Sequence, residues 1–191
     1  MKGKMLLGLT AILMLTGAAV PVKADDVWKF DAQRFVLKEY TGTETDVVVP
    51  DTMDEGVPVK RLGTQLLAGS ETLTSVVVPD SVTILDVGAL SYDNNLSEIT
   101  LSSNLINIGW NAISSNDALT ELTIPASVCI IDSYAVSGCY ALKKIVFEGA
   151  CPLIGSEAFV MLSDDVVIYV PDDQIEEYKK GFEENNKNLN I

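Results

Sequence analysis

The sequence predicts a mainly β solenoid, in which similar coils stack on one another, short irregular or helical segments form the convex side, and a cap covers each end. Short apolar runs recur along the chain, and five of them follow one another at a constant 23-residue step. Each run alternates between apolar and outward positions, which is typical of a strand with one buried face. One coil cannot bury its apolar residues alone, so the repetition itself predicts stacking. The five runs begin at Val76, Ile99, Leu122, Ile145 and Ile168.

Other apolar positions keep the same 23-residue register. One column holds large aliphatic residues, and another holds mostly alanines, which would let the chain turn closely over the core. Their members are Leu62, Leu85, Ile108, Ile131 and Ile154 in the first column, and Leu66, Ala89, Ala112, Ala135 and Ala158 in the second. An earlier run at Val47 precedes Val76 by a longer step, and the six additional residues fall in a turn-rich insertion at residues 51–60. The predicted solenoid therefore covers residues 47–171.

A stack of coils has two raw ends, and the sequence before the first coil offers a cap for one of them. Residues 28–30 and 35–40 are typical of two strands joined by a short turn. We expect them to pair as a hairpin over the N-terminal end. The predicted capping segment is residues 25–46.

The sequence after the last coil predicts a helical cap within residues 172–191. A helix is expected from Gln174 to Glu184, with Asp172 or Asp173 capping its start. One face of this helix is apolar and would cover the last coil. That face consists of Ile175, Tyr178 and Phe182.

Residues 1–24 have the features of a secretory signal peptide. Lys2 and Lys4 give a positive start, and an apolar run follows from Met5 to Ala19. This run is shorter than the roughly 20 residues that span a bilayer, so a membrane anchor is the less favoured interpretation. We expect cleavage after Ala24 and a secreted, extracellular protein that either diffuses freely or associates with the cell surface.

The charge of the chain excludes several classes of partner. The sequence has 13 basic residues, 27 acidic residues and no histidine. Loss of the three lysines in the signal peptide leaves 10 basic residues and a net charge of −17. Nucleic acids and anionic membranes bind basic surfaces, so we expect neither a nucleic-acid partner nor membrane insertion of the mature chain.

The sequence also argues against catalysis. Without histidine, Ser-His-Asp and Cys-His arrangements are impossible, and no glycine-rich phosphate loop is present. We therefore predict no catalytic, cofactor-binding or metal-binding residues. A remote alternative is a glycan-acting enzyme that uses Glu98 and Glu121, one strand spacing apart, near the carboxylate separation of about 5 Å in retaining glycosidases. An open sheet has nothing to desolvate either carboxyl group and raise its pKa.

Three cysteines leave two interpretations open. Cys139 and Cys151 fall at repeat positions that should be buried, which favours small core residues that behave as hydrophobes. A bridge between Cys129 and Cys151 in neighbouring coils is the alternative. The spacing of the three residues matches no zinc signature.

Two stretches of the sequence carry a family resemblance. Residues 78–90 contain Val-Pro-Asp-Ser-Val and then Leu-Asp-Val-Gly-Ala-Leu, and residues 124–142 contain Ile-Pro-Ala-Ser-Val, Ile-Asp-Ser-Tyr-Ala-Val, Cys139 and Leu142. This pattern resembles the BspA-like leucine-rich repeats of bacterial surface and secreted proteins, over roughly residues 27–182. The resemblance implies a leucine-rich-repeat solenoid, an extracellular setting and, in some members, adhesion to host or neighbouring-cell molecules. It implies no shared catalytic residue.

The sequence departs from the family pattern at a few positions. Ser102 and Glu148 replace a proline, and Asp86 and Asp132 replace a glycine. We expect these changes to affect local turns more than the fold.

The outward side chains of the repeated strands form the candidate binding surface. Glu98, Glu121 and Lys144 are expected side by side in successive coils, and Tyr169 beside Val146 would supply an amphipathic anchor. The alternative is an ordinary sheet surface, since threonine and valine suit any strand and Lys144 would simply pair with Glu121. The candidate residues are Val77, Glu98, Thr100, Glu121, Thr123, Lys144, Val146 and Tyr169.

These observations favour a secreted or cell-surface module that binds proteins, as an adhesin or an interaction scaffold, without catalysis. The expected partner is an extracellular protein or glycan, and the sequence does not identify it. A structural, self-associating surface component is the alternative, because exposed strands at the solenoid edges would support assembly.

Overall fold

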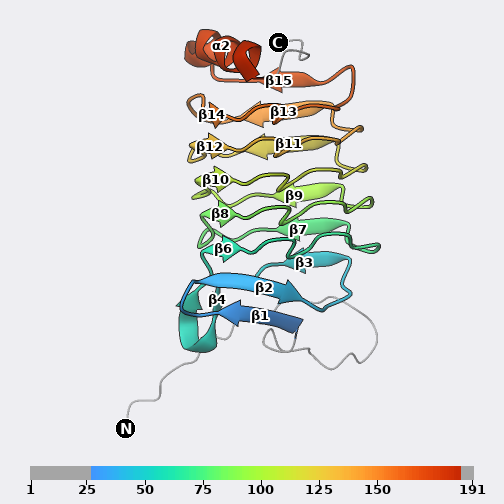
Figure 1. Ribbon diagram of the computed structural model, residues 1–191, viewed down its shortest axis with the longest axis vertical. Helices are drawn as coiled ribbons and strands as arrows, with labels where there is room; N and C mark the ends of the chain where they lie inside the picture. The colour runs from blue at the N-terminus through green and yellow to red at the C-terminus, as the bar shows by residue number, and fades with distance from the viewer. Residues whose placement is uncertain (1–26, 186–191) are drawn as a thin grey trace.

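A computed structural model of the chain describes residues 27–185, which form a solenoid of about six coils with one helix at its C-terminal end (Figure 1). The predicted solenoid and its two caps are confirmed. The predicted signal peptide, residues 1–24, and the end of the C-terminal tail lie outside the described residues. No helix within residues 27–185 has the length and hydropathy needed to cross a bilayer.

The repeated strands lie in register along one side of the stack (Figure 1). They pair in parallel as two three-stranded sheets, with the orders β3-β7-β9 and β11-β13-β15. Paired residues lie one coil apart, as in Val76 with Ile99 and Leu122 with Ile145, and the longer first coil keeps this register with Val47 paired to Val76. The strands are β3 (Asp46–Val48), β7 (Ser75–Val77), β9 (Glu98–Thr100), β11 (Glu121–Ile124), β13 (Lys144–Phe147) and β15 (Val167–Tyr169).

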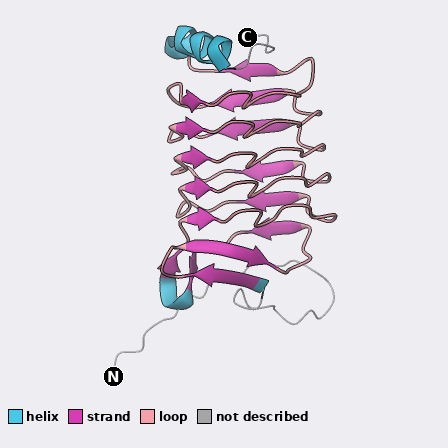
Figure 2. Ribbon diagram, in the orientation of Figure 1, coloured by secondary structure: helices cyan, strands magenta, loops and turns pink. Residues whose placement is uncertain are grey.

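A second sheet runs along another side of the stack, where the sequence predicted irregular or helical segments. Its seven strands have the order β1-β2-β6-β8-β10-β12-β14, and the described chain between residues 57 and 171 contains no helix (Figure 2). The coil strands are only two residues long, too short to show a period in the sequence. Their bounds are β6 (Arg61–Leu62), β8 (Ile84–Leu85), β10 (Asn107–Ile108), β12 (Ile130–Ile131) and β14 (Leu153–Ile154).

The N-terminal cap is an extension of this second sheet. Strands β1 (Trp28–Asp31) and β2 (Val36–Tyr40) form the predicted antiparallel hairpin, and β2 then pairs in parallel with β6. The rings of Trp28 and Tyr40 lie 4.3 Å apart between centroids and close the end of the core. The insertion at residues 51–60 forms a smaller antiparallel pair, β4 (Thr52–Met53) and β5 (Val57–Pro58), around the 3-10 turn η1 (Asp54–Gly56).

The C-terminal cap is helix α2 (Ile175–Asn185), preceded by the 3-10 turn η2 (Asp172–Gln174). Tyr178 and Phe182 are buried as predicted, and the Tyr178 hydroxyl donates to the carbonyl oxygens of Gly149 and Ala150. The prediction for Ile175 was wrong, because this residue is 37% exposed at the first turn of α2. The prediction of an aspartate cap was also wrong, since Pro171 occupies the N-cap position of η2 and no side chain caps that turn.

Each coil turns with two residues in the left-handed backbone region, four positions apart. Both turn positions repeat with the period of the solenoid and have φ angles of about 54–75°. Glycine is the residue that adopts this region without strain, yet side chains as large as tyrosine occupy it here. The first column is Gln65, Gly88, Asn111, Tyr134 and Glu157, and the second is Gly69, Tyr92, Ser115, Gly138 and Met161.

Glycine and aspartate alternate at one position between the second sheet and this turn. A Cβ atom on Gly63 would lie 2.5 Å from the carbonyl oxygen of Leu37, and one on Gly109 would lie 2.6 Å from that of Leu85. The glycine coils therefore approach the backbone of the preceding coil closely. The intervening coils carry Asp86 and Asp132, the two departures from the family glycine noted above. The column is Gly63, Asp86, Gly109, Asp132 and Gly155.

The apolar columns form one continuous core, as the register predicted. The aliphatic column and the alanine column are both buried along the whole stack. The exceptions among the predicted core positions lie near the C-terminal end of the stack, where Cys151, Ile168 and Val170 are only partly buried.

A buried polar column runs beside this core. The Asn116 amide donates to the carbonyl oxygens of Leu90 and Ile113, at 2.9 and 3.0 Å, and its own oxygen accepts from the backbone N–H of Asp93. Asp93 occupies the same position one coil earlier, where its Oδ1 accepts from the backbone N–H of Ser70. Its Oδ2 is buried without a hydrogen-bond partner. This oxygen takes the place of an amide nitrogen, so a protonated carboxyl group suits the site and a carboxylate does not.

Burial therefore raises the pKa of Asp93 to about 7. The native pKa lies above the usual value, so the protonated group stabilises the fold fully below about pH 4. That contribution is lost as the pH rises through about 7.

We predict that Asp93→Asn stabilises the protein increasingly as the pH rises. At pH 4 the two proteins should have the same free energy of unfolding. At pH 8 the variant should be more stable by about 2–4 kcal/mol, because the amide can donate where the carboxylate cannot. Urea unfolding at both pH values measures the difference.

Asp80→Asn is the matched control with the opposite sign. Hydrogen bonds from the backbone and side chain of Ser103 hold the pKa of the Asp80 carboxyl below its usual value. This substitution should therefore destabilise the protein at pH 8 and have less effect as the pH falls. An Asp93→Asn benefit that is equal at pH 4 and pH 8 would contradict the assignment of a protonated Asp93.

Candidate functional site

The structure places the predicted binding residues on the outward face of the repeated strands. Their Cα atoms follow the strand register, so that Thr123 pairs with Val146 and Val146 with Tyr169. Tyr169 is 51% exposed, and Val77 is 39% exposed. Inward neighbours such as Leu122 and Ile124 are buried, so the predicted alternation is confirmed. The face is an exposed surface of paired strands.

This face is divided into two parts, whereas the sequence predicted one continuous row. No ladder joins β9 to β11 in the described chain. The β3-β7-β9 sheet therefore holds Val77, Glu98 and Thr100, and the β11-β13-β15 sheet holds the other five predicted residues. Glu98 and Glu121 face each other across this break. Like charges at directly opposed positions destabilise strand pairing, which is consistent with an interruption at this step.

The β3-β7-β9 sheet has an end that is rich in hydroxyl groups and negatively charged. The Asp46 carboxylate accepts hydrogen bonds from the hydroxyl groups of Ser75 at 2.6 Å, Thr45 at 3.0 Å and Thr74 at 3.2 Å. These bonds, led by that of Ser75, hold the pKa of Asp46 below its usual value. This end of the face keeps its negative charge well into the acid range.

The β11-β13-β15 sheet carries side chains of both charges and the larger apolar side chains. The Lys144 ammonium donates to the Glu121 carboxylate at 3.1 Å, so the ordinary ion pair considered above does form. Lys143 lies 3.7 Å from Asp165 at the edge of the same sheet. Val167 is 49% exposed and continues the surface beside Tyr169. This half of the face combines an apolar patch with a polar rim.

The cysteines do not form a site. All three are free thiols, so the bridge between Cys129 and Cys151 is absent. Cys139 is buried in the polar column, where desolvation raises its pKa to about 11 and leaves the thiol protonated at neutral pH. Within residues 27–185, no cluster of acidic and cysteine side chains is arranged to hold a metal ion.

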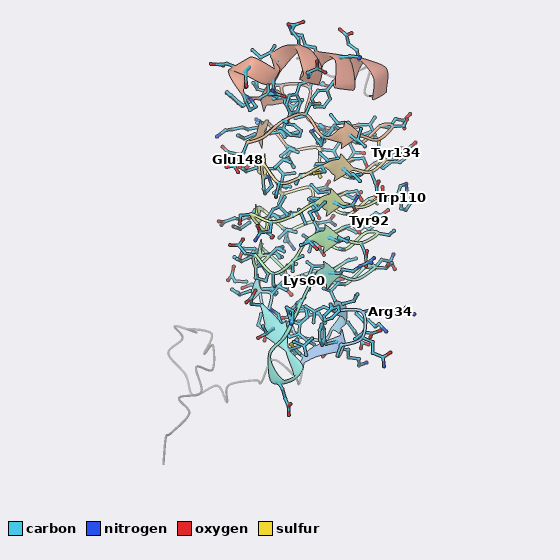
Figure 3. The ribbon with its side chains drawn as sticks, turned by 90° about the vertical axis from the view of Figure 1, so that its left-hand side faces the viewer. Arg34, Lys60, Tyr92, Trp110, Tyr134 and Glu148 are labelled. Carbon is cyan, nitrogen blue, oxygen red and sulfur yellow. The ribbon has the colours of Figure 1, made fainter. Side chains whose placement is uncertain are left out.

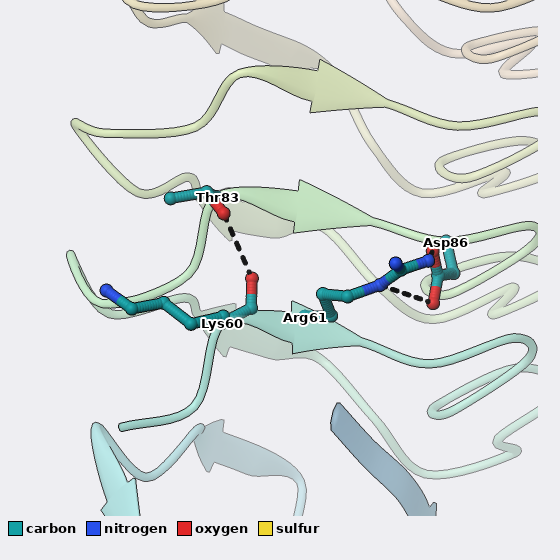
Figure 4. Close-up of polar contacts among 4 residues, drawn as sticks. All are labelled: Lys60, Arg61, Thr83 and Asp86. Atoms are coloured by element: carbon teal, nitrogen blue, oxygen red, sulfur yellow. Dashed lines mark hydrogen bonds and ion pairs between the residues drawn. The ribbon is translucent and has the colours of Figure 1, made fainter. Parts of the chain in front are cut away.

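Sequence reasoning missed a pocket beside the N-terminal hairpin. The hairpin turn and the first two coils surround a cavity of about 560 Å³. One wall is fixed by Arg61, whose guanidinium makes two hydrogen bonds to the Asp86 carboxylate of the next coil (Figure 4). The neighbouring backbone is held by the Thr83 hydroxyl, which donates to the carbonyl oxygen of Lys60 at 3.3 Å (Figure 4). No motif in the sequence marks this pocket, because its residues meet only when the hairpin docks on the first coil.

Aromatic side chains follow one edge of the stack from this pocket. Tyr92, Trp110 and Tyr134 lie along the same edge as Arg34 (Figure 3). Trp110 is 48% exposed, and its ring lies 6.4 Å from that of Tyr134. Their alignment with the pocket is not visible in the sequence.

Known proteins share this architecture. The pattern of the BspA type leucine-rich repeat region matches residues 60–189 in six copies. No curated protein sequence matches the chain significantly.

Several solved structures are similar to the chain. A leucine-rich repeat protein from Bacteroides capillosus is 34% identical with a TM-score of 0.55, over 64% of this chain and 93% of that protein. A leucine-rich repeat protein from T. pallidum is 21% identical with a TM-score of 0.55, over 84% of this chain and 95% of that protein. The pneumococcal vaccine antigen PcpA is 17% identical with a TM-score of 0.62, over 82% of this chain and 43% of that protein. The last two likenesses concern the fold alone.

We predict that the Glu121–Lys144 ion pair contributes little to stability. Its side chains are 66% and 42% exposed, so water screens the attraction. Alanine replacement of each residue and of both should give a coupling energy of at most about 1 kcal/mol in chemical unfolding. The longer pair of Lys143 with Asp165 is the control and should couple still less. A coupling well above the range of exposed ion pairs would show that the pair is a structural element and not part of an open surface.

Proposed function

Because the chain belongs to the BspA-type leucine-rich-repeat family, we propose that it is a secreted or cell-surface module that binds an extracellular protein through its outward strand face. The observation that carries this proposal is the apolar patch on the β11-β13-β15 sheet. There Val146, Val167 and Tyr169 lie in register on β13 and β15, with Tyr169 about half exposed. An exposed tyrosine next to aliphatic side chains is a common anchor at protein interfaces.

The polar groups around this patch support the same proposal. Thr123 lies next to Val146, and the ion pair of Glu121 with Lys144 borders the patch on the N-terminal side of the strands. Interfaces commonly surround an apolar centre with such a polar rim. A partner that covers this rim gains hydrogen bonds to groups already held in place by the sheet, which lowers the entropy cost of binding.

The location outside the cell is part of the proposal. It is supported by the signal-peptide features of residues 1–24 and by the family, and the net charge of −14 suits a soluble partner and not a nucleic acid. We propose no catalytic role for Glu98 or Glu121, because both are exposed on an open surface.

Self-association is the second candidate function, and one observation favours it. Leu153 is 74% exposed and pairs in register with Ile130, which is 37% exposed, on the second sheet. Such neighbouring apolar side chains suit contact with another copy of the chain.

We predict that the triple variant Thr123→Arg, Val146→Glu and Tyr169→Ala loses binding. The purified protein would be screened against arrayed extracellular-matrix proteins, glycans and bacterial surface extracts. A partner that contacts the patch should bind the variant at least about tenfold more weakly, since removal of an interface anchor typically costs about 2 kcal/mol or more. Circular dichroism and thermal unfolding confirm that the variant folds.

The matched control is Ile130→Ser with Leu153→Ser, which changes the seven-stranded sheet and leaves the outward strand face intact. This variant should bind the partner normally. If the triple variant binds as tightly as the unmodified protein, the strand face is not the site. Loss of oligomers in the Ile130 and Leu153 variant would then support the self-associating function.

A further inference from the structure

The pocket at the N-terminal hairpin is a local reversal of the charge of this protein. The chain has a net charge of −14, yet three of its 13 basic residues line this one cavity. Arg61 is held by Asp86, and Lys38 lies 2.6 Å from the Asp31 carboxylate. Within residues 27–185, the Arg34 guanidinium has no ion-pair partner. A pocket with two neutralised cations and one free guanidinium favours a ligand with a single negative group.

The residue next to Arg34 gives the pocket an aromatic wall. Phe35 has a φ angle of 56° and is 42% exposed. Its carbonyl oxygen accepts from the backbone N–H groups of Lys60 and Arg61, which fixes the turn against the first coil. Glycine or asparagine would adopt this left-handed conformation with less strain, yet a phenylalanine occupies it. Phe35 lines the cavity together with its sequence neighbour Arg34.

The remaining lining groups suit a sugar. Gln33 and Thr64 bring an amide and a hydroxyl group to the cavity, which can exchange hydrogen bonds with sugar hydroxyls. Farther along the same edge, Trp110 offers a second exposed ring two coils beyond Thr64, at a coil spacing of about 4.8 Å (Figure 3). A chain of two or three sugar rings would reach from one aromatic ring to the other.

The strands beside the pocket disfavour a peptide. Strands β2 and β6 are each paired on both sides, in the order β1-β2-β6-β8. No free strand edge at the cavity therefore offers the main-chain hydrogen bonds through which extended peptides usually bind. The recognition chemistry here consists of a cation, an aromatic ring and side-chain polar groups.

We propose that this pocket binds the carboxylate-bearing sugar of an acidic oligosaccharide. The Arg34 guanidinium donates two hydrogen bonds to the carboxylate, and the Phe35 ring packs on the apolar face of the sugar ring. The next sugar extends along the edge of the solenoid toward Trp110. This site is separate from the outward strand face, so ligand binding here can be tested independently of the proposed protein-binding function.

The test is calorimetric titration of the purified protein with sialyllactose, with neutral lactose and with a tri-glutamate peptide. Sialyllactose should bind, and lactose should bind at least about tenfold more weakly, because it lacks the carboxylate. Arg34→Gln should weaken sialyllactose binding by a similar factor. Binding should also weaken as the salt concentration rises.

Phe35→Gly separates recognition from folding. Glycine accepts the φ angle of this turn, so the thermal midpoint should stay close to that of the unmodified protein while sialyllactose affinity falls severalfold. Lys143→Gln is the charge-matched control, since it removes an exposed cation near the other end of the stack, and it should leave affinity unchanged.

Three results would overturn the proposal. The first is no measurable binding of sialyllactose, or equal binding of lactose. The second is unchanged affinity in Arg34→Gln. The third is tighter binding of tri-glutamate than of sialyllactose, which would assign the pocket to acidic peptides.

Discussion

The structure depends on one constraint, which is that each coil must find the hydrogen-bond partners for its backbone in the coils next to it. The strands within a coil are two to four residues long, and apart from the small β4–β5 pair of the insertion they form no ladder with each other. The N–H and C=O groups of a coil are instead paired with neighbours in the two strand sheets and along the left-handed turn, as in the N–H of Leu90 with the carbonyl of Ala112. This requirement keeps the paired positions in register, so additional residues must loop out of the coil, as the insertion at residues 51–60 does between β3 and β7. It also makes the two caps necessary, since the outermost coils lack a neighbour on one side.

Much of this architecture could be predicted because the apolar residues repeat at a constant spacing, which gives the register of the coils. Columns such as Leu62 to Ile154 repeat over five coils, and only a stack of coils explains them. The second sheet could not be predicted, because a strand of two residues shows no alternation. The left-handed columns were hidden for a related reason, since only some of their members are glycine or asparagine and Tyr92 or Tyr134 gives no signal of an unusual backbone. Ile175 was misassigned because helical spacing alone does not show how much of a helix face the last coil covers.

The candidate sites differ in how far sequence reasoning could reach them. Strand register places Thr123, Val146 and Tyr169 on one face directly, so their alignment follows from the period. The interruption between β9 and β11 does not follow from the period, because the 23-residue step is the same there as between the strands that pair. The hairpin pocket is still less visible, since Arg34 and Thr64 are brought together by the docking of a cap and not by the repeat. The face made by the repeat and the pocket made by the cap also differ in character. The former is open and extended, whereas the latter is concave, cationic and local.

The alternation of Gly63, Asp86, Gly109, Asp132 and Gly155 bears on how such a protein can change its length during evolution. A glycine coil approaches the preceding backbone too closely for a Cβ atom, and an aspartate coil does not. Duplication or deletion of a single coil would set two glycine coils or two aspartate coils against each other. A change of two coils at once preserves the alternation along the whole stack. At this position the solenoid therefore repeats every two coils, whereas its apolar residues repeat with every coil.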